Sequence, residues 1–386
     1  MTAKLSLTAQ DIAEMISSTL LAEMDYSRKL EFCTGQSLAG DFIPLNTIFQ
    51  DLERILERIG IQFGIESSQL AGKDINLMAE LILNQTGGRP CRVTFFTSGS
   101  TGTPVPAASN FTDLEQEIHS LASIFPDRRR VVSFVPRHHI YGFLFSILLP
   151  KALGVPKEYS PPLPGMEQIK KMRNGDLIIA FPLLWKKLEN LDGVFPENVF
   201  GVTSTGPCPA ETITGLQAQG LARMTEVYGS SETGGVGFRH DPSGMYTLLS
   251  HWKKTGDSTI ERTSATGDKQ QHVLQDHLEW QGARFRPLKR ADKAVQVGGI
   301  NVYPARVENF FRELPQVRDC CVRLMRADEG ERLKIFIVPA SEKENAALEK
   351  ELRNLAIDKL SHHEKPGKYN FGPSLPVSNI GKLSDW

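Results

Sequence analysis

Residues 92–104 read RVTFFTSGSTGTP, and this stretch decides the fold. Its first part, Val93 to Phe96, is a short apolar run that favours a buried strand. A turn of Ser, Thr and Gly follows directly. Small residues let backbone N–H groups approach phosphate oxygens, and the hydroxyl groups add further donors. We therefore expect a strand that leads into a phosphate-binding loop, formed by Thr97, Ser98, Gly99, Ser100, Thr101 and Gly102.

Further apolar runs recur downstream of this loop. The runs from Val131 to Val135, Leu177 to Ala180 and Val199 to Val202 each read as a buried strand. Helical patterns lie between them, at Leu114 to Ile124 and at Ala210 to Gly220. Strands that alternate with helices predict an α/β fold with a largely parallel sheet.

The character of the chain changes near Asp292. Beyond it, the patterns predict a helix, two strands and a second helix, at residues 306–314, 320–325, 333–338 and 346–360. We therefore expect two parts: a large N-terminal α/β lobe at residues 1–291 and a small, mobile C-terminal α+β lobe at residues 292–386.

A second polar segment carries chemical groups of a different kind. Residues 228–235 read YGSSETGG. The ring of Tyr228 could stack on a nucleobase, and the carboxylate of Glu232 could hold a magnesium ion on phosphates. The first loop lacks the Gly-Lys-Ser/Thr ending of a Walker loop. Each segment alone would also suit an ordinary turn, but the pair is much more specific.

Composition excludes several classes of protein. The net charge of -1 leaves no broad basic field for nucleic acid or an anionic membrane. The five cysteines form no CxxC pair, which argues against disulfides and structural zinc and favours a reducing compartment. The longest apolar stretch, Ile140 to Pro150, is shorter than the ~20 residues that span a bilayer. We expect a cytoplasmic protein without a membrane span.

Together these segments resemble the adenylate-forming superfamily, which includes acyl- and aryl-CoA synthetases. The first is similar to that family's phosphate-binding loop, and the second to its Tyr-Gly-x-Ser/Thr-Glu motif, which includes Gly229 and Ser231. Residues 204–209, STGPCP, resemble the turn beside adenine and place Gly206 and Pro207 there. Residues 136–142, PRHHIYG, resemble the His-x-x-Gly segment of the acyl pocket, with His139 at the matching position.

The C-terminal third carries the same resemblance. It implies that Arg290 contacts ribose, that Asp292 is the hinge and that Gly298 and Gly299 help form a thiol tunnel. The terminal Gly-Lys element implies that Lys382 is the catalytic lysine.

The ribose-binding aspartate of the family needs a choice between three positions. The Thr-Gly-Asp strings that end at Asp257 and Asp268 both lie too far upstream of Arg290. Asp276 has the expected spacing and precedes a hairpin pattern at residues 278–286. We assign the ribose role to Asp276.

The resemblance implies an AMP-forming ligase with ATP, Mg²⁺ and either coenzyme A or phosphopantetheine as cofactors. The acid would be a small carboxylic acid, by analogy an aromatic one, since the short N-terminal region resembles phenylacetate- or hydroxybenzoate-type ligases. Two alternatives stay open. The enzyme could load an acyl carrier protein through basic residues such as Arg128 to Arg130, or the chain could be a non-catalytic nucleotide binder. Val105, where many members have Lys, slightly favours the latter.

Overall fold

The computed structural model describes most of the chain. The residues outside the description are 1–3, 24–50, 99–103, 161–165, 192, 291–292, 299, 327–328, 331, 342–344, 358 and 377–383. The chain divides into a large unit, residues 1–97 and 106–288, and a small unit, residues 98–105 and 289–386. The predicted boundary between residues 291 and 292 falls outside the described residues and stays a prediction.

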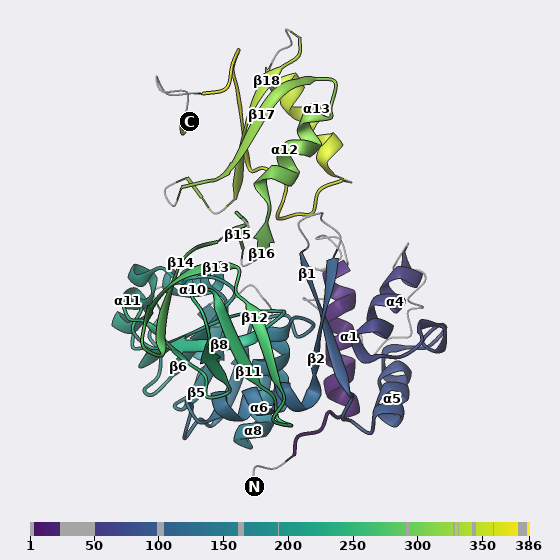
Figure 1. Ribbon diagram of the computed structural model, residues 1–386, viewed down its shortest axis with the longest axis vertical. Coiled ribbons are helices and arrows are strands. Elements are labelled where there is room, and N and C mark those ends of the chain that lie inside the picture. The colour runs from purple at the N-terminus through teal and green to yellow at the C-terminus, as the bar shows by residue number, and fades with distance from the viewer. Residues whose placement is uncertain are drawn as a thin grey trace. The chain divides into compact units, whose positions relative to one another are not determined.

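A nine-stranded sheet organises the large unit (Figure 1). Its strands run in the order β13-β14-β9-β8-β7-β6-β5-β3-β4. The half from β4 to β7 is parallel, and the half from β7 to β14 contains antiparallel pairs. The bounds are β3 Arg130–Ser133, β4 Lys157–Tyr159, β5 Asp176–Ile179, β6 Phe200–Thr203, β7 Arg223–Ser230, β8 Gly234–Arg239, β9 Tyr246–Leu248, β13 Asp276–Gln281 and β14 Arg284–Arg290.

Both faces of the parallel half are covered, which explains its nearly continuous apolar strands. Successive side chains of a strand point to opposite faces. Accordingly, Ile178 of β5 packs in one core cluster with Trp185, while Leu177 and Ile179 pack in the other with Ile118. Among the helices that contribute to these clusters are α6 Phe111–Ala122, α7 Ile140–Gly142, the π-helix η2 Phe143–Leu148, α8 Leu149–Leu153, α9 Met166–Lys170, α10 Pro182–Glu189 and α11 Ala210–Ala218.

Smaller elements complete the large unit. They are helices α1 Ala9–Glu23, α4 Leu52–Phe63, the short η1 Ser67–Gln69 and α5 Ile75–Thr86, the paired strands β1 Arg92–Ser98 and β2 Pro104–Asn110, and a sheet of β10 Trp252–Lys254, β11 Thr259–Thr263 and β12 Lys269–Val273. Asp74 caps α5, because its side chain accepts a hydrogen bond of 2.8 Å from the Leu77 N–H.

The small unit has its own core. Its strands are β15 Val295–Val297, β16 Ile300–Val302, β17 Val317–Leu324, β18 Leu333–Pro339 and β19 Lys368–Phe371, and its helices are α12 Pro304–Arg312 and α13 Asn345–Ile357. Strand β18 pairs antiparallel with β17 and parallel with β19. Phe311 of α12 and Leu352 of α13 pack with Ile335 of β18. A helix stripe needs such a sheet face to bury its apolar side chains.

The expected α/β class is confirmed. The predicted strands at residues 93–96, 131–135, 177–180 and 199–202 correspond to β1, β3, β5 and β6, and the hairpin at 278–286 corresponds to β13 and β14. Strand β1 extends to Ser98, so the backbone of Thr97 and Ser98 belongs to a strand rather than to the predicted loop. Within the described residues, no helix is long and apolar enough to cross a membrane.

Candidate active site

The turn between β7 and β8 carries Glu232, and we call residues 230–235 the Glu232 turn. Ser230 and Thr233 close it through reciprocal hydrogen bonds: the Ser230 N–H donates to Thr233 Oγ1 at 3.1 Å, and the Thr233 N–H donates to Ser230 Oγ at 3.3 Å. Gly234 has a φ of +69°, a region that suits glycine. The Glu232 side chain between these residues is exposed, so its carboxylate is accessible to solutes.

Tyr228 and Asp276 meet beside this turn. The Tyr228 hydroxyl donates a hydrogen bond of 2.5 Å to Asp276 Oδ2. The Tyr228 ring also lies edge-on to Phe285, with ring centroids 5.2 Å apart, and it remains half-buried. The structure therefore brings together Tyr228, which was predicted to stack on the nucleobase, and Asp276, which was predicted to bind the ribose.

The turn at residues 204–209 lies next to the same strand. Ser204 Oγ donates a hydrogen bond of 2.8 Å to the carbonyl oxygen of Val227, the residue before Tyr228. Thr205 has a φ of +76°. This turn follows β6, which runs parallel to β7. The carboxyl ends of parallel strands are where open α/β sheets bind ligands, so Gly206 and Pro207 follow β6 at the same sheet edge where β7 leads to Tyr228.

A buried carboxylate fixes this second turn. Glu226 Oε1 accepts a hydrogen bond of 3.2 Å from the Cys208 N–H, and its Oε2 lies 2.6 Å from Arg239 Nε. Glu226 was not predicted from the sequence, because a single acidic residue in a strand carries no motif. Burial, with help from the nearby Glu226 carboxylate, raises the pKa of the Cys208 thiol to about 12. The thiol stays protonated at neutral pH and is a poor nucleophile.

His139 precedes α7 and is half-buried. Its carbonyl oxygen accepts a hydrogen bond of 2.8 Å from the Phe143 N–H. The neighbouring His138 lies with its ring centroid 4.1 Å from that of His139. His138 Nδ1 is 2.8 Å from Ser18 Oγ of α1, a partner that nothing in the sequence indicated. Gly142 is required here, since an added Cβ would lie 1.9 Å from the Pro136 carbonyl oxygen.

A family model described as AMP-binding enzyme matches residues 83–260, and one described as AMP-binding enzyme C-terminal domain matches residues 306–382. A 4-coumarate–CoA ligase of Cereibacter sphaeroides is 38% identical over 304 residues, which cover 78% of this chain and 72% of that protein. This chain belongs to the AMP-binding, adenylate-forming enzymes.

Other relatives agree with this family. A 4-coumarate–CoA ligase of Halorhodospira halophila is 36% identical over 327 residues, 83% of this chain and 82% of that protein. Among solved structures, an amide bond synthetase from Marinactinospora thermotolerans superposes with a TM-score of 0.60 at 17% identity, covering 76% of this chain and 67% of that one. That similarity supports the fold alone. The predicted family and enzyme class are confirmed.

Several predicted residues of this adenylate-forming enzyme cannot be placed. Gly99, Ser100, Thr101, Gly102, Asp292, Gly299 and Lys382 lie outside the described residues. Arg290 ends β14, and Gly298 of the small unit has a φ of +58° between β15 and β16. The ribose, hinge, tunnel and lysine roles assigned to these positions stay predictions.

The predicted metal residue is Glu232 alone. Within the part of the chain that the structure describes, no group of three or more His, Cys, Asp or Glu residues could hold a metal ion. Mg²⁺ usually keeps several waters and binds through one or two carboxylates together with substrate phosphates. The single exposed carboxylate of Glu232 fits a magnesium ion that arrives on ATP.

Proposed function

We propose that this enzyme activates a small aromatic carboxylic acid with ATP and transfers the acyl group to the thiol of coenzyme A. The hydrogen bond between Tyr228 and Asp276 carries the proposal, because it joins the predicted adenine-stacking residue near the carboxyl end of β7 to the predicted ribose-binding residue at the start of β13. The relatives named 4-coumarate–CoA ligases support the aromatic acid and coenzyme A.

The nucleotide would be held from several sides. Tyr228 would stack on adenine beside Gly206 and Pro207, with Gly229 and Ser231 in the adjoining motif. Asp276 would accept hydrogen bonds from the ribose hydroxyls, joined by Arg290. The loop residues Thr97, Ser98, Gly99, Ser100, Thr101 and Gly102 would donate to the phosphates. Glu232 would hold Mg²⁺, which neutralises developing charge on the phosphates when bound.

The first half-reaction converts the carboxylate into an acyl-adenylate, from which AMP can later leave. A carboxylate oxygen of the acid attacks the α-phosphorus of ATP, pyrophosphate leaves, and a mixed anhydride forms. The protein has to hold two anions in line, and Lys382 would lie between them as a point charge. His139 would border the acid. The protonated thiol of Cys208 argues against an acyl-enzyme at that residue.

The second half-reaction uses an external thiol. Its sulfur attacks the acyl carbon, and AMP leaves. Rotation about Asp292 would replace Lys382 by the segment of Gly298 and Gly299, which follows the general logic of domain closure.

Two of the three arginines at positions 128–130, the basic residues suggested for binding a carrier protein, have partners within this protein. Arg128 is buried and donates to the Asn198 carbonyl oxygen at 2.7 Å, and Arg130 Nη2 lies 2.6 Å from Asp176. This supports free coenzyme A as the acceptor.

Product analysis tests the proposal. The protein is incubated with ATP, Mg²⁺, coenzyme A and a panel of cinnamates, benzoates and aliphatic acids, and acyl-CoA and AMP are measured by mass spectrometry. We expect equal amounts of both products with a hydroxycinnamate or benzoate. Products only from aliphatic acids would contradict the aromatic specificity. AMP with free acid and no acyl-CoA, from hydrolysis of the adenylate, would show that coenzyme A is not the acceptor.

A further inference from the structure

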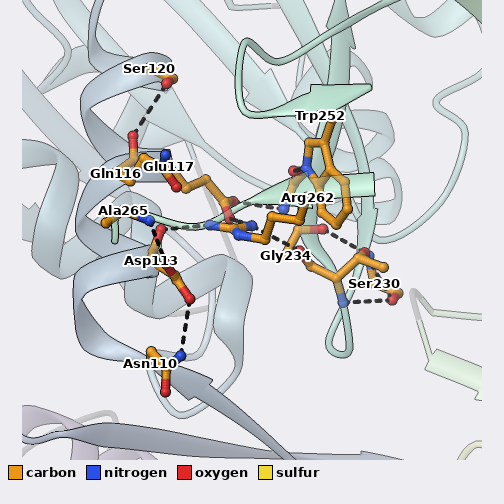
Figure 2. A network of polar contacts seen from close by, with 12 residues as sticks. Asn110, Asp113, Gln116, Glu117, Ser120, Ser230, Gly234, Trp252, Arg262 and Ala265 are labelled. Carbon is orange, nitrogen blue, oxygen red and sulfur yellow. Dashed lines mark hydrogen bonds and ion pairs between the residues drawn. The ribbon is translucent and has the colours of Figure 1, made fainter. Parts of the chain in front are cut away.

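A buried ion pair contacts the Glu232 turn (Figure 2). Glu117 of α6 and Arg262 of β11 are only 1% and 8% exposed. Arg262 Nη1 lies 3.7 Å from Glu117 Oε2. Burying an ion pair costs desolvation energy, and such a pair is weak as a source of stability alone. Its placement therefore calls for another explanation.

Both members of the pair bind the backbone of the Glu232 turn. Glu117 Oε1 accepts a hydrogen bond of 2.7 Å from the Gly235 N–H. Arg262 Nη1 donates to the Thr233 carbonyl oxygen at 3.4 Å. A third buried group, Trp252 Nε1, donates to the Gly235 carbonyl oxygen at 2.7 Å. Thr233 and Gly235, which lie just beyond the exposed Glu232, are thus held by three side chains on other elements.

Further hydrogen bonds join helix α6 to strand β11. Arg262 Nη2 donates to the Asp113 carbonyl oxygen of α6 at 2.7 Å, and Gln116 of α6 donates to the Thr263 carbonyl oxygen of β11 at 3.2 Å. Figure 2 shows Arg262 and Glu117 reaching toward one another between the helix and the strands. Glu117 and Arg262 therefore contact the Glu232 turn from two elements that are bonded to each other.

The Glu117 carboxylate lies so close to position 234 that only glycine fits there. An added Cβ at Gly234 would lie 2.3 Å from Glu117 Oε2. The turn and Glu117 are thus in direct contact, with no room for a side chain between them. Since Ser230 and Thr233 close the turn internally, fixing residues 233–235 also fixes the direction in which the backbone presents Glu232.

We propose that Glu117 and Arg262 are positioning residues that hold the Glu232 turn in the geometry needed to bind the magnesium ion of ATP. This inference rests on the proposed function only in assigning the metal to Glu232. The role acts through the backbone of residues 233–235, and neither side chain touches the metal. Partners of metal ligands commonly change affinity by about 10- to 100-fold when removed.

The test measures metal binding without requiring turnover. Free Mn²⁺ is titrated by electron paramagnetic resonance in the presence of the protein and ATP. Glu117→Asp withdraws the carboxylate by one methylene and leaves the Gly235 N–H unbonded, so we expect Mn²⁺ affinity to fall by about tenfold. Glu117→Gln keeps an acceptor oxygen and should bind Mn²⁺ like the wild type. Metal-free ATP binding should be equal in all three proteins.

Glu115→Gln is the matched control. Glu115 lies on the same helix but pairs with Arg89, at 2.8 Å, and should leave Mn²⁺ binding unchanged. A folded Glu117→Asp protein with wild-type Mn²⁺ affinity would overturn the inference, as would an equal loss in Glu115→Gln. If Glu117→Asp does not fold, Trp252→Phe, which removes the Nε1 donor to Gly235 together with the pyrrole ring, replaces it with the same expected direction.

The outcomes separate this inference from the proposed function. A wild-type protein that binds Mn²⁺ with ATP but makes no acyl-CoA would contradict the proposed function and leave the positioning role open to the same comparison of variants. A wild-type protein that binds no Mn²⁺ with ATP would overturn both.

Discussion

Tyr228 and Asp276, 48 positions apart, meet at a hydrogen bond of 2.5 Å. A side chain that is already oriented loses less entropy when it binds a ligand. At the scale of single residues, this contact orients the carboxylate of Asp276 beside the ring of Tyr228.

Tyr228→Phe isolates this contact, because it keeps the ring and removes only the hydroxyl group. We expect the KM for ATP to rise about tenfold, the scale of one hydrogen bond to a charged group, with little change in kcat. Steady-state kinetics with ATP varied would measure this. An unchanged KM would mean that the hydrogen bond does not prepare Asp276 for ribose.

Sequence reasoning reached some residues of the site and missed others for a physical reason. Tyr228 and Asp276 were predicted, because a local motif and a fixed spacing carry them. Ser18, Glu117 and Arg262 were missed, because their partners lie far away along the chain. A polar residue on an amphipathic helix reads as a solvent-facing position until the fold shows what covers it.

At the scale of elements, α6 and β11 support the Glu232 turn through a carboxyl group with an unusual titration. Burial raises the pKa of Glu117 from 4.5 to about 7, although the Arg262 charge opposes this shift. In the same region burial and the Arg262 charge lower the pKa of His251 from 6.5 to about 3. The two groups affect stability in opposite directions.

The sign of the Glu117 contribution follows from linkage. Because its pKa is higher in the folded state, its stabilising contribution is complete below pH 4.5 and is lost as the pH rises through 7. The depressed pKa of His251 gives stability that is complete above pH 6.5 and is lost as the pH falls toward 3. Between these limits the two slopes partly cancel.

Glu117→Gln should remove the fall in stability that Glu117 causes as the pH rises, and should leave the pH dependence that comes from His251. We expect the free energy of unfolding of the variant to gain on the wild type by up to about 3 kcal/mol between pH 5 and 8, the value of a shift of this size. Urea denaturation across this pH range measures the difference. Parallel curves for the two proteins would show that Glu117 does not titrate in the folded state.

The elements themselves were more predictable than their contacts. The strands β3, β5 and β6 were found because each is a short apolar run, and each is largely buried in the structure. The alternation of Leu177, Ile178 and Ile179 between two clusters was not predictable, since all three are equally apolar. Which face each side chain takes depends on the helices above and below.

At the scale of the whole molecule, the chain consists of a large and a small unit, and the predicted mechanism divides two half-reactions between two arrangements of them. The lysine at position 382 should act in the first half-reaction only. Lys382→Ala should slow adenylate formation by about 10²- to 10³-fold, the scale for removing one electrostatic stabiliser.

The same variant should convert a pre-formed acyl-adenylate and coenzyme A to acyl-CoA at the wild-type rate. Rapid mixing of each half-reaction separates the two steps. An equal loss in both would mean that Lys382 supports folding or both steps, and full adenylate formation would remove it from the active site.

The central claim is that this enzyme activates an aromatic acid as its adenylate, and exchange of labelled pyrophosphate into ATP without any thiol tests it most directly. We predict strong, Mg²⁺-dependent exchange with a hydroxycinnamate or benzoate, weak exchange with aliphatic acids, and none with Glu232→Gln. A folded protein that binds ATP but exchanges no pyrophosphate with any acid would contradict the account.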